Sequence, residues 1–228
     1  MTGNCFKRVL IIGQPFNNYS GGGITLTNLF KGWPRDKIAV ASTGHFLQNI
    51  SFDVCNLYYQ LGREEQFWIF PFSVLQKSFP SGPQTFKIQE TPIKTRVKIN
   101  VRKILVDRIF FPFIQWIGLF HCFSKITLSK RLEDWLSDYK PEVLYLQIST
   151  REQIIFSQQL IDYLNIPTAI HIMDDWPSTI SKNGLFNKYW GEKINKEFRY
   201  LLDRADLFLS ISDAMSSEYL RRYNREFI

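Results

Sequence analysis

The chain has 228 residues, of which 45% are hydrophobic and 16% are aromatic. This composition supports a packed core and excludes a disordered chain. The three cysteines are far apart and form no C-x-x-C pair, which argues against a disulfide framework or a zinc site and favours a reducing compartment. The short apolar run near the N-terminus has no cleavage-site pattern after it, so it predicts a first strand and not a signal peptide.

The positive charge is concentrated in one segment. The whole chain carries a formal net charge of +7. Residues 94–131 contain one acidic residue, Asp107, and nine basic residues: Lys94, Arg96, Lys98, Arg102, Lys103, Arg108, Lys125, Lys130 and Arg131. The charge excess of this segment is larger than that of the whole chain, so the remaining residues are close to neutral.

A glycine-rich loop follows the first predicted strand. The unbroken apolar run at residues 9–12 is typical of a strand buried on both faces of a parallel sheet. A polar loop comes next, and a helical pattern begins at Ile24. A helix N-terminus attracts anions, and glycine lets a phosphate or sugar hydroxyl approach the backbone. The candidate contacts are Tyr19, Gly21, Gly22 and Gly23. The P-loop and dinucleotide motifs do not fit this spacing, so a ligand cradle and a plain turn remain equal alternatives.

Strand and helix patterns alternate along most of the chain. Strands are predicted at 9–12, 38–41, 143–147, 168–173 and 207–211, and helices at 153–164, 187–204 and 213–223, with another helix ending near residue 139. This order predicts an α/β, Rossmann-like fold with a mostly parallel sheet, strand order near 3-2-1-4-5-6 and helices on both faces. Residues 46–83 are interpreted as a variable strand–loop insertion.

Residues 95–123 are predicted to be helical, in a basic part and an apolar part. The apolar part, residues 109–123, falls short of the ~20 residues that a membrane-spanning helix needs, so no transmembrane span is expected. Burial in the core and an interfacial position on a membrane remain equal alternatives.

Several segments together resemble a known family. The quoted segments are the strand–glycine–helix start, LEDWLSDYKPEVLYLQ, IPTAIHIMDDWP and ADLFLSISDAMSSEYLRRY. They are similar to the N-terminal domain of retaining GT-B glycosyltransferases, especially family four. In that family a Lys-Pro-Asp-hydrophobic step enters a central strand, and residues 140–143 match it with Glu for Asp. The family's Ala-Asp…Ser-x-x-Met pattern matches residues 205–206 and 212–215.

The resemblance implies a domain organisation and a function. Residues 1–228 are expected to form one Rossmann-like domain with a basic, aromatic helical insertion around 94–131. It would be the acceptor-binding half of an enzyme that transfers a sugar from a nucleotide-sugar to a cell-surface polysaccharide or lipid-linked acceptor. The nucleotide-sugar pocket would belong to a second domain that this sequence lacks, so the chain alone is expected to be inactive. No metal or other cofactor is expected. The alternative is a non-catalytic Rossmann-like module that binds a sugar or nucleotide.

The predicted catalytic residues follow a central strand. Asp174 and Asp175 could orient an acceptor hydroxyl or accept its proton, although adjacent acids in a loop are also common as helix caps. Many relatives carry a His-Asp pair here, which this sequence lacks. Trp176 could stack on a sugar ring. His171 is a weaker candidate, because its place inside a buried strand favours a packed core residue. By the resemblance, Gly22 and Gly23 would face acceptor and donor phosphate.

The basic segment also predicts a partner. Its charge and clustered aromatics predict docking of residues 94–131 on an anionic membrane, and a cytoplasmic protein that is peripheral on the inner face. No nucleic-acid partner is expected, because the aromatics lie beyond the charges and no nucleic-acid-binding motif accompanies them.

Overall fold

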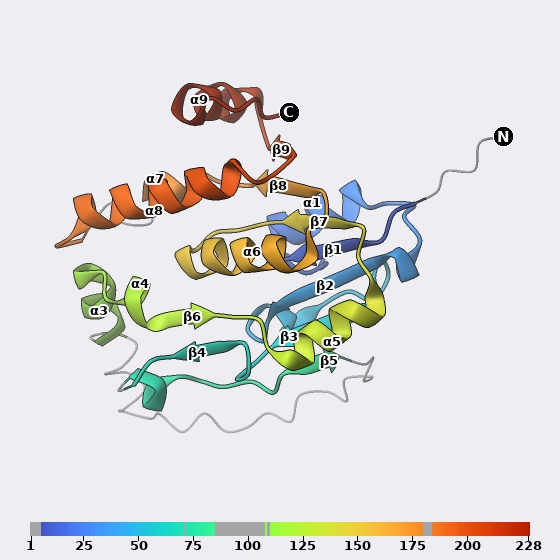
Figure 1. The fold of residues 1–228 in the computed structure, drawn as a ribbon, viewed down its shortest axis with the longest axis horizontal. Coiled ribbons are helices and arrows are strands. Elements are labelled where there is room, and N and C mark those ends of the chain that lie inside the picture. Colours follow the sequence, from blue (N-terminus) through green and yellow to red (C-terminus); the bar gives the residue numbers. More distant parts are fainter. Residues whose placement is uncertain (1–5, 71, 85–107, 109, 180–183) are drawn as a thin grey trace.

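The computed structural model describes residues 6–70, 72–84, 108, 110–179 and 184–228 (Figure 1). A seven-stranded sheet has the order β5-β3-β2-β1-β7-β8-β9. Its strands are β1 (Val9–Ile12), β2 (Ile38–Thr43), β3 (Leu57–Leu61), β5 (Gly82–Gln84), β7 (Val143–Leu146), β8 (Thr168–Ile172) and β9 (Leu207–Ser210). All neighbours pair in parallel except β5, which runs antiparallel to β3. The predicted α/β fold and the strand order 3-2-1-4-5-6 are confirmed for the parallel strands.

Two strands of this sheet, β3 and β5, come largely from a region that the sequence analysis interpreted as an insertion. We expected an insertion over residues 46–83, but β3 from this region is the third parallel strand of the sheet. Tyr58 and Tyr59, which point to opposite faces, are both buried. The polar residue within β3, Gln60, is also buried and donates its side-chain amide to the Pro80 carbonyl at 2.7 Å. The apolar run before Gln60 is visible in the sequence, but the partner that allows Gln60 to be buried lies 20 residues away.

The main helices begin and end close to the predicted positions. They are α1 (Gly21–Leu29), α5 (Lys130–Tyr139), α6 (Arg151–Leu164), α8 (Asn187–Leu202) and α9 (Asp213–Tyr223). Four of them start at a Ser or Thr whose hydroxyl accepts a backbone N–H three residues later: Ser20, Ser129, Thr150 and Ser212. Three end at a residue with left-handed φ: Lys140, Asn165 and Asn224. These local caps explain why the helix boundaries were predictable.

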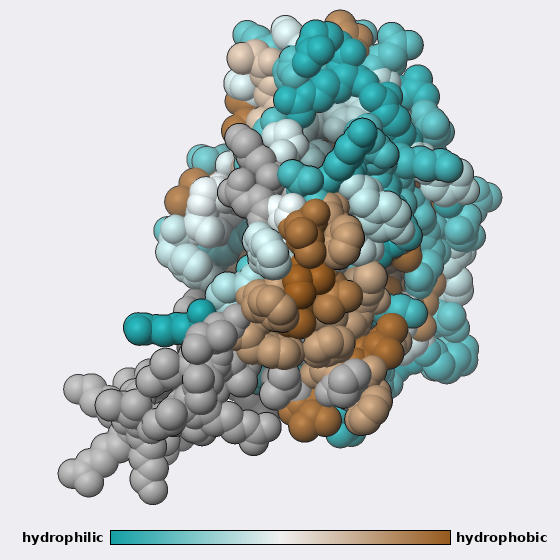
Figure 2. Space-filling model, turned by 90° about the vertical axis from the view of Figure 1, so that its left-hand side faces the viewer, coloured by the Kyte–Doolittle hydropathy of each residue, from teal (hydrophilic) through white to brown (hydrophobic). Residues whose placement is uncertain are grey.

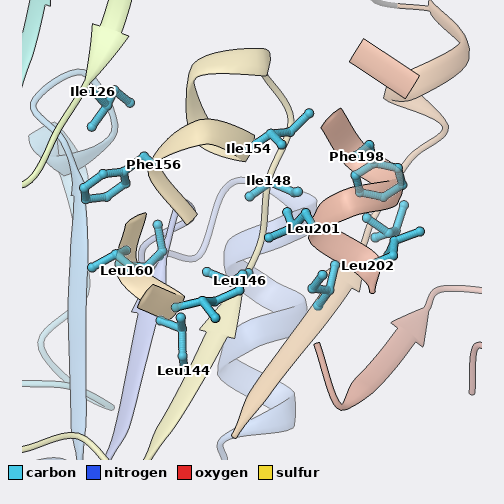
Figure 3. Close-up of a cluster of buried hydrophobic side chains, with 14 of the residues drawn as sticks. Ile126, Leu144, Leu146, Ile148, Ile154, Phe156, Leu160, Phe198, Leu201 and Leu202 are labelled. Atoms are coloured by element: carbon cyan, nitrogen blue, oxygen red, sulfur yellow. The ribbon is translucent and has the colours of Figure 1, made fainter. Parts of the chain in front are cut away.

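Hydrophobic cores lie on both faces of the sheet. The larger cluster packs residues of β7 and β8 against α5, α6, α8 and α9, and Figure 3 shows its centre around Leu146, Phe156 and Leu201. The smaller cluster packs the opposite face against α1 through Leu26 and Phe30. Helices therefore cover both faces, as the alternating pattern predicts.

The aromatic segment after residue 108 forms two short helices, α3 (Phe111–Ile117) and α4 (Phe120–Phe123). They are separated at Gly118, which has a left-handed φ of 77° and packs so closely on Trp190 that a Cβ would lie 2.4 Å from its ring. The described residues 110–123 therefore do not form a single continuous helix. Of the basic helix predicted over 95–108, residues 95–107 lie outside the described residues, so the proposed insertion and single-domain organisation stay predictions.

A small second sheet adjoins these helices. It pairs β4 (Gln66–Trp68) antiparallel with β6 (Ser124–Ile126). The other short elements are α7 (Trp176–Thr179), η1 (Arg35–Lys37), η2 (Phe46–Asn49) and η3 (Phe72–Leu75). In the described parts of the chain, no helix combines the length and the apolar character needed to cross a membrane.

Candidate functional site

The glycine loop is a turn filled by its own side chains. Asn17 is buried, and its Oδ1 accepts the Ser20 N–H at 2.8 Å, the Tyr19 N–H at 3.2 Å and the Ser20 hydroxyl at 2.8 Å. The Ser20 hydroxyl in turn accepts the Gly23 N–H at 3.1 Å. A Cβ on Gly23 would lie 2.4 Å from Asn17 Cγ, so this glycine accommodates the turn. Gly21 and Tyr19 are exposed, and Gly22 faces the Gln14 side chain.

The first parallel strand and β7 approach each other closely at their carboxyl ends. Gly13 has a φ of 111°, and a Cβ there would lie 2.0 Å from the Gln147 carbonyl oxygen. Between β1 and β7 the strand order reverses direction, which is where open α/β sheets place their ligands. The Gln147 side-chain amide is buried with no hydrogen-bond partner among the described residues. This amide is therefore a polar group at the switch point that a water or ligand can satisfy.

The two predicted catalytic acids have different surroundings. Asp174 is exposed and makes no hydrogen bond or ion pair to the described residues. Asp175 is half-buried and forms a bidentate ion pair with Arg222 of α9, at 2.8 and 3.1 Å. It also accepts the hydroxyls of Ser178 at 2.6 Å and Tyr219 at 3.2 Å. Asp175 thus joins α7 to α9, and of the two acids only Asp174 has a carboxylate without a partner among the described residues.

Two other predicted residues lie in the core. Trp176 is 5% exposed and packs edge-to-face against Phe198, so it has no open face for a sugar ring. The stacking role predicted for Trp176 is not supported by this position. His171 is buried in β8, where its Nδ1 hydrogen-bonds the Tyr145 hydroxyl, and burial lowers the pKa of its imidazole. His171 is therefore a packed core residue, as its position in the strand predicts.

An open pocket of about 540 Å³ lies past the carboxyl end of β7. Its described lining comes from the α3–α4 pair, the turn from β7 into α6, the end of α7, and the residues from Gly184 into the first turn of α8. Its aromatic walls are Trp116, Phe120, Phe186 and Trp190, and its polar lining is Gln115, His121, Ser149, Thr150, Glu152, Thr179 and Asn187. An apolar cavity with a few convergent polar groups is the usual form of a small-molecule site.

His121 and Glu152 are the titratable residues of the pocket lining. Burial, together with the positive charge of Arg151, lowers the pKa of His121, and its Nδ1 is buried with no described hydrogen-bond partner. Burial raises the pKa of Glu152, which outweighs the opposing hydrogen bonds from its own backbone N–H and from Thr150. Both shifts favour the uncharged forms. Perturbed titratable groups that meet in one cavity mark it as a functional-site candidate.

One ion pair holds the pocket together. Arg151, in the first turn of α6, forms a bidentate pair with Glu197 of α8, with both N–O distances at 2.6 Å. Its third contact is to the His121 carbonyl, which joins α4 to the same guanidinium. The Arg151 guanidinium carbon also lies 5.4 Å from the centroid of the Trp190 ring. This residue therefore fixes three segments of the pocket relative to each other.

The sequence did not reveal this pocket. His121 and Glu152 stand 31 positions apart and match no motif spacing. The available signal was the position of Ser149 and Thr150 after a predicted strand, which placed them at the ligand-binding edge of a parallel sheet. Among the described residues, no three His, Cys, Asp or Glu side chains are grouped as a metal site would require.

Comparison with known proteins does not extend this picture. No protein-family model matches the sequence, and no curated protein matches it either. The functional argument therefore rests on the parallel sheet and on the pocket at its carboxyl edge.

Proposed function

We propose that this chain is the acceptor-binding half of a glycosyltransferase that moves a sugar from a nucleotide-sugar to a lipid-linked or polysaccharide acceptor. The observation that carries the proposal is that the pocket at the sheet edge opens into an exposed apolar surface. Trp116 and Phe186 line the pocket and are also 49% and 52% exposed. A lipid-linked acceptor matches this arrangement, because its polar head would bind in the pocket and its apolar tail would contact the adjoining surface.

The apolar surface, here called the aromatic patch, covers the end of the molecule where α3, α4 and the start of α8 lie. Figure 2 shows hydrophobic residues gathered across this face. Its exposed members in this region are Phe113, Trp116, Leu119, Leu185, Phe186 and Tyr189. An exposed apolar area of this kind is typical of a membrane or protein contact.

Charge favours an anionic membrane as the partner of the aromatic patch. The sequence from 108 to 131 contains no acidic residue, and Lys125 and Lys188 are exposed close to the elements of the patch. Aromatic side chains at the interface and basic residues beside it are the features of a peripheral membrane contact. The inner face of a cytoplasmic membrane carries anionic lipids, which supports the proposed peripheral location on that face.

The catalytic contribution of this half is assigned to Asp174. Its carboxylate has no partner in the part of the chain that the structure describes, whereas that of Asp175 is held by Arg222 and two hydroxyls. In a protein that carries a donor domain, Asp174→Asn is expected to lower turnover by ~10²–10⁴-fold, the usual contribution of a positioned general base. Asp175→Asn is expected to lower stability first, because it weakens the contact between α7 and α9. Wild-type turnover in Asp174→Asn would remove Asp174 from this role.

Membrane binding and sugar transfer test the proposal separately. In vesicle co-sedimentation, the chain should bind phosphatidylglycerol vesicles in a salt-sensitive manner, and Leu185→Ser should weaken binding. The matched control is Leu220→Ser on α9, which is similarly exposed, 49% against 55%, and lies outside the patch. Binding that is equal in both variants would contradict docking through this surface.

The transfer assay uses the product of the complete reading frame, with UDP- and GDP-sugars and lipid-linked acceptors. Transfer of labelled sugar is expected there, and residues 1–228 alone are expected to bind no nucleotide-sugar tightly in calorimetry. Sugar binding without transfer in the complete protein would instead favour the non-catalytic binding module.

A further inference from the structure

We infer that the pocket past β7 recognises an uncharged sugar ring and excludes phosphate and acidic sugars. The inference rests on the proposed function and adds to it the chemical class of the acceptor group that enters the pocket. It is carried by the charges, the hydrogen-bond donors and the aromatic walls of the described lining.

The charges around the pocket do not favour an anion. None of the described residues that line it is Lys or Arg. Cations next to the described lining include Arg151 and Lys193. The guanidinium of Arg151 is already engaged by both oxygens of Glu197 and by the His121 carbonyl. The Lys193 ammonium lies 5.6 Å from the centroid of the Trp190 ring and donates to the Tyr189 hydroxyl at 3.4 Å. Phosphate and carboxylate sites in proteins use free guanidinium or ammonium groups, which this lining lacks.

The helix N-terminus at the pocket is also occupied. The first turn of α6 is capped by Thr150, whose hydroxyl accepts the Gln153 N–H at 3.4 Å. The Gln153 side-chain oxygen accepts the Ser149 N–H at 2.8 Å, one residue before the N-cap. Glu152 is the acidic residue in the first turn of α6, and it lines the pocket. An acidic side chain therefore already stands where an incoming phosphate would otherwise bind.

The remaining features suit a neutral, hydroxyl-bearing ring. The indole of Trp116 and the rings of Phe120 and Phe186 offer apolar surface to the C–H face of a sugar. The buried Nδ1 of His121 has no partner among the described residues, and a ligand hydroxyl can satisfy it. Glu152 can accept a second hydroxyl. The volume of about 540 Å³ lies within the ~300–1,000 Å³ of small-molecule sites.

The test is to measure ligand binding to the chain by saturation-transfer NMR and by tryptophan fluorescence. The neutral probes are methyl glucoside, methyl mannoside and N-acetylglucosamine, and the anionic probes are glucuronic acid and inorganic phosphate. At least one neutral probe should bind and neither anion should compete with it. Glu152→Gln should weaken neutral-sugar binding by about tenfold, the loss expected for one hydrogen bond to a charged or buried acceptor. The control Glu192→Gln, on the exposed side of α8, should bind like the wild type.

A second variant protects the test against a folding defect in Glu152→Gln. Gln115 is exposed at the pocket, so Gln115→Lys should fold normally and should gain binding of glucuronic acid. Binding of phosphate or glucuronic acid to the wild type, equal binding in Glu152→Gln and its control, or no binding of any neutral probe would each overturn the inference. Membrane binding and sugar transfer that persist alongside such a result would leave the proposed function standing.

Discussion

The glycine loop after β1 and the pocket after β7 lie at the same edge of the sheet, yet they differ in what occupies them. The loop holds three consecutive glycines, and its interior is taken by Asn17, which accepts three hydrogen bonds within the turn. The pocket has no comparable sequence motif, and its space of about 540 Å³ is open. A conspicuous glycine run can thus serve backbone packing, while an open site is assembled from unremarkable residues.

The comparison also separates two uses of close packing. At the loop, glycines let the chain contact itself, as at Gly23 against Asn17. At the pocket, Arg151 of α6 is joined to α4 and α8 by charge-assisted hydrogen bonds. Substitutions at the loop should therefore act on stability, and substitutions around the pocket should act on ligand binding as well.

The largest effect is expected for Gly13→Ala. Its φ of 111° is unfavourable for any L-residue with a side chain, and the new Cβ would lie 2.0 Å from the Gln147 carbonyl. We expect a loss of about 3 kcal/mol in the free energy of unfolding, because both strain and overlap must be relieved. Urea denaturation measures it. A loss below ~1 kcal/mol would show that β1 and β7 can separate at this end.

Next in size is Glu197→Gln at the pocket. It leaves the Arg151 guanidinium, which is 17% exposed, without its carboxylate. A loss of about 2–3 kcal/mol is expected, somewhat below the ~3–5 kcal/mol of a fully buried pair. Sugar binding should fall as well, because α8 and α4 are no longer fixed together. The control is Asp203→Asn, which breaks the more exposed pair with Arg225 and should cost at most ~1 kcal/mol.

A pH series on Glu152→Gln gives an intermediate effect. Burial raises the pKa of Glu152 above its ordinary value of 4.5, so the folded chain binds this proton more tightly than the unfolded chain. The stability that Glu152 contributes is full below pH 4.5 and is lost as the pH rises through the folded pKa. The variant avoids that loss, so its stability relative to the wild type should increase from pH 5 to pH 8. Denaturation of Gln115→Ala, an uncharged change in the same pocket, should show no such trend.

The smallest effect is expected for Gly21→Ala in the glycine loop. A Cβ here meets no atom within 4 Å, and the residue already lies in α1. The substitution should stabilise the chain by about 0.4–1 kcal/mol through the entropy of the unfolded state. If the loop is a plain turn, the sugar transfer proposed above should stay unchanged. Lost turnover with gained stability would instead support a ligand cradle at this loop.

Much of the fold could be predicted because its signals are local. Apolar runs such as residues 143–147 predicted buried strands, and a Ser or Thr before an apolar helical pattern predicted where helices begin. The place of β3 in the main sheet was not predicted, because the burial of Gln60 depends on the Pro80 carbonyl 20 residues away. A local sequence pattern contains no information on a hydrogen-bond partner that lies far away along the chain.

The sequence by itself determined the alternation of strands and helices, the parallel sheet and the edge where a ligand site belongs. The tertiary structure alone decided which residues form that site. It buried Trp176 against Phe198, tied Asp175 to Arg222 across 47 positions, and brought His121 beside the start of α6. The periodicity of helices and strands is encoded within a few neighbouring residues. Burial and ion pairing depend instead on which helices and strands contact each other after the chain has folded.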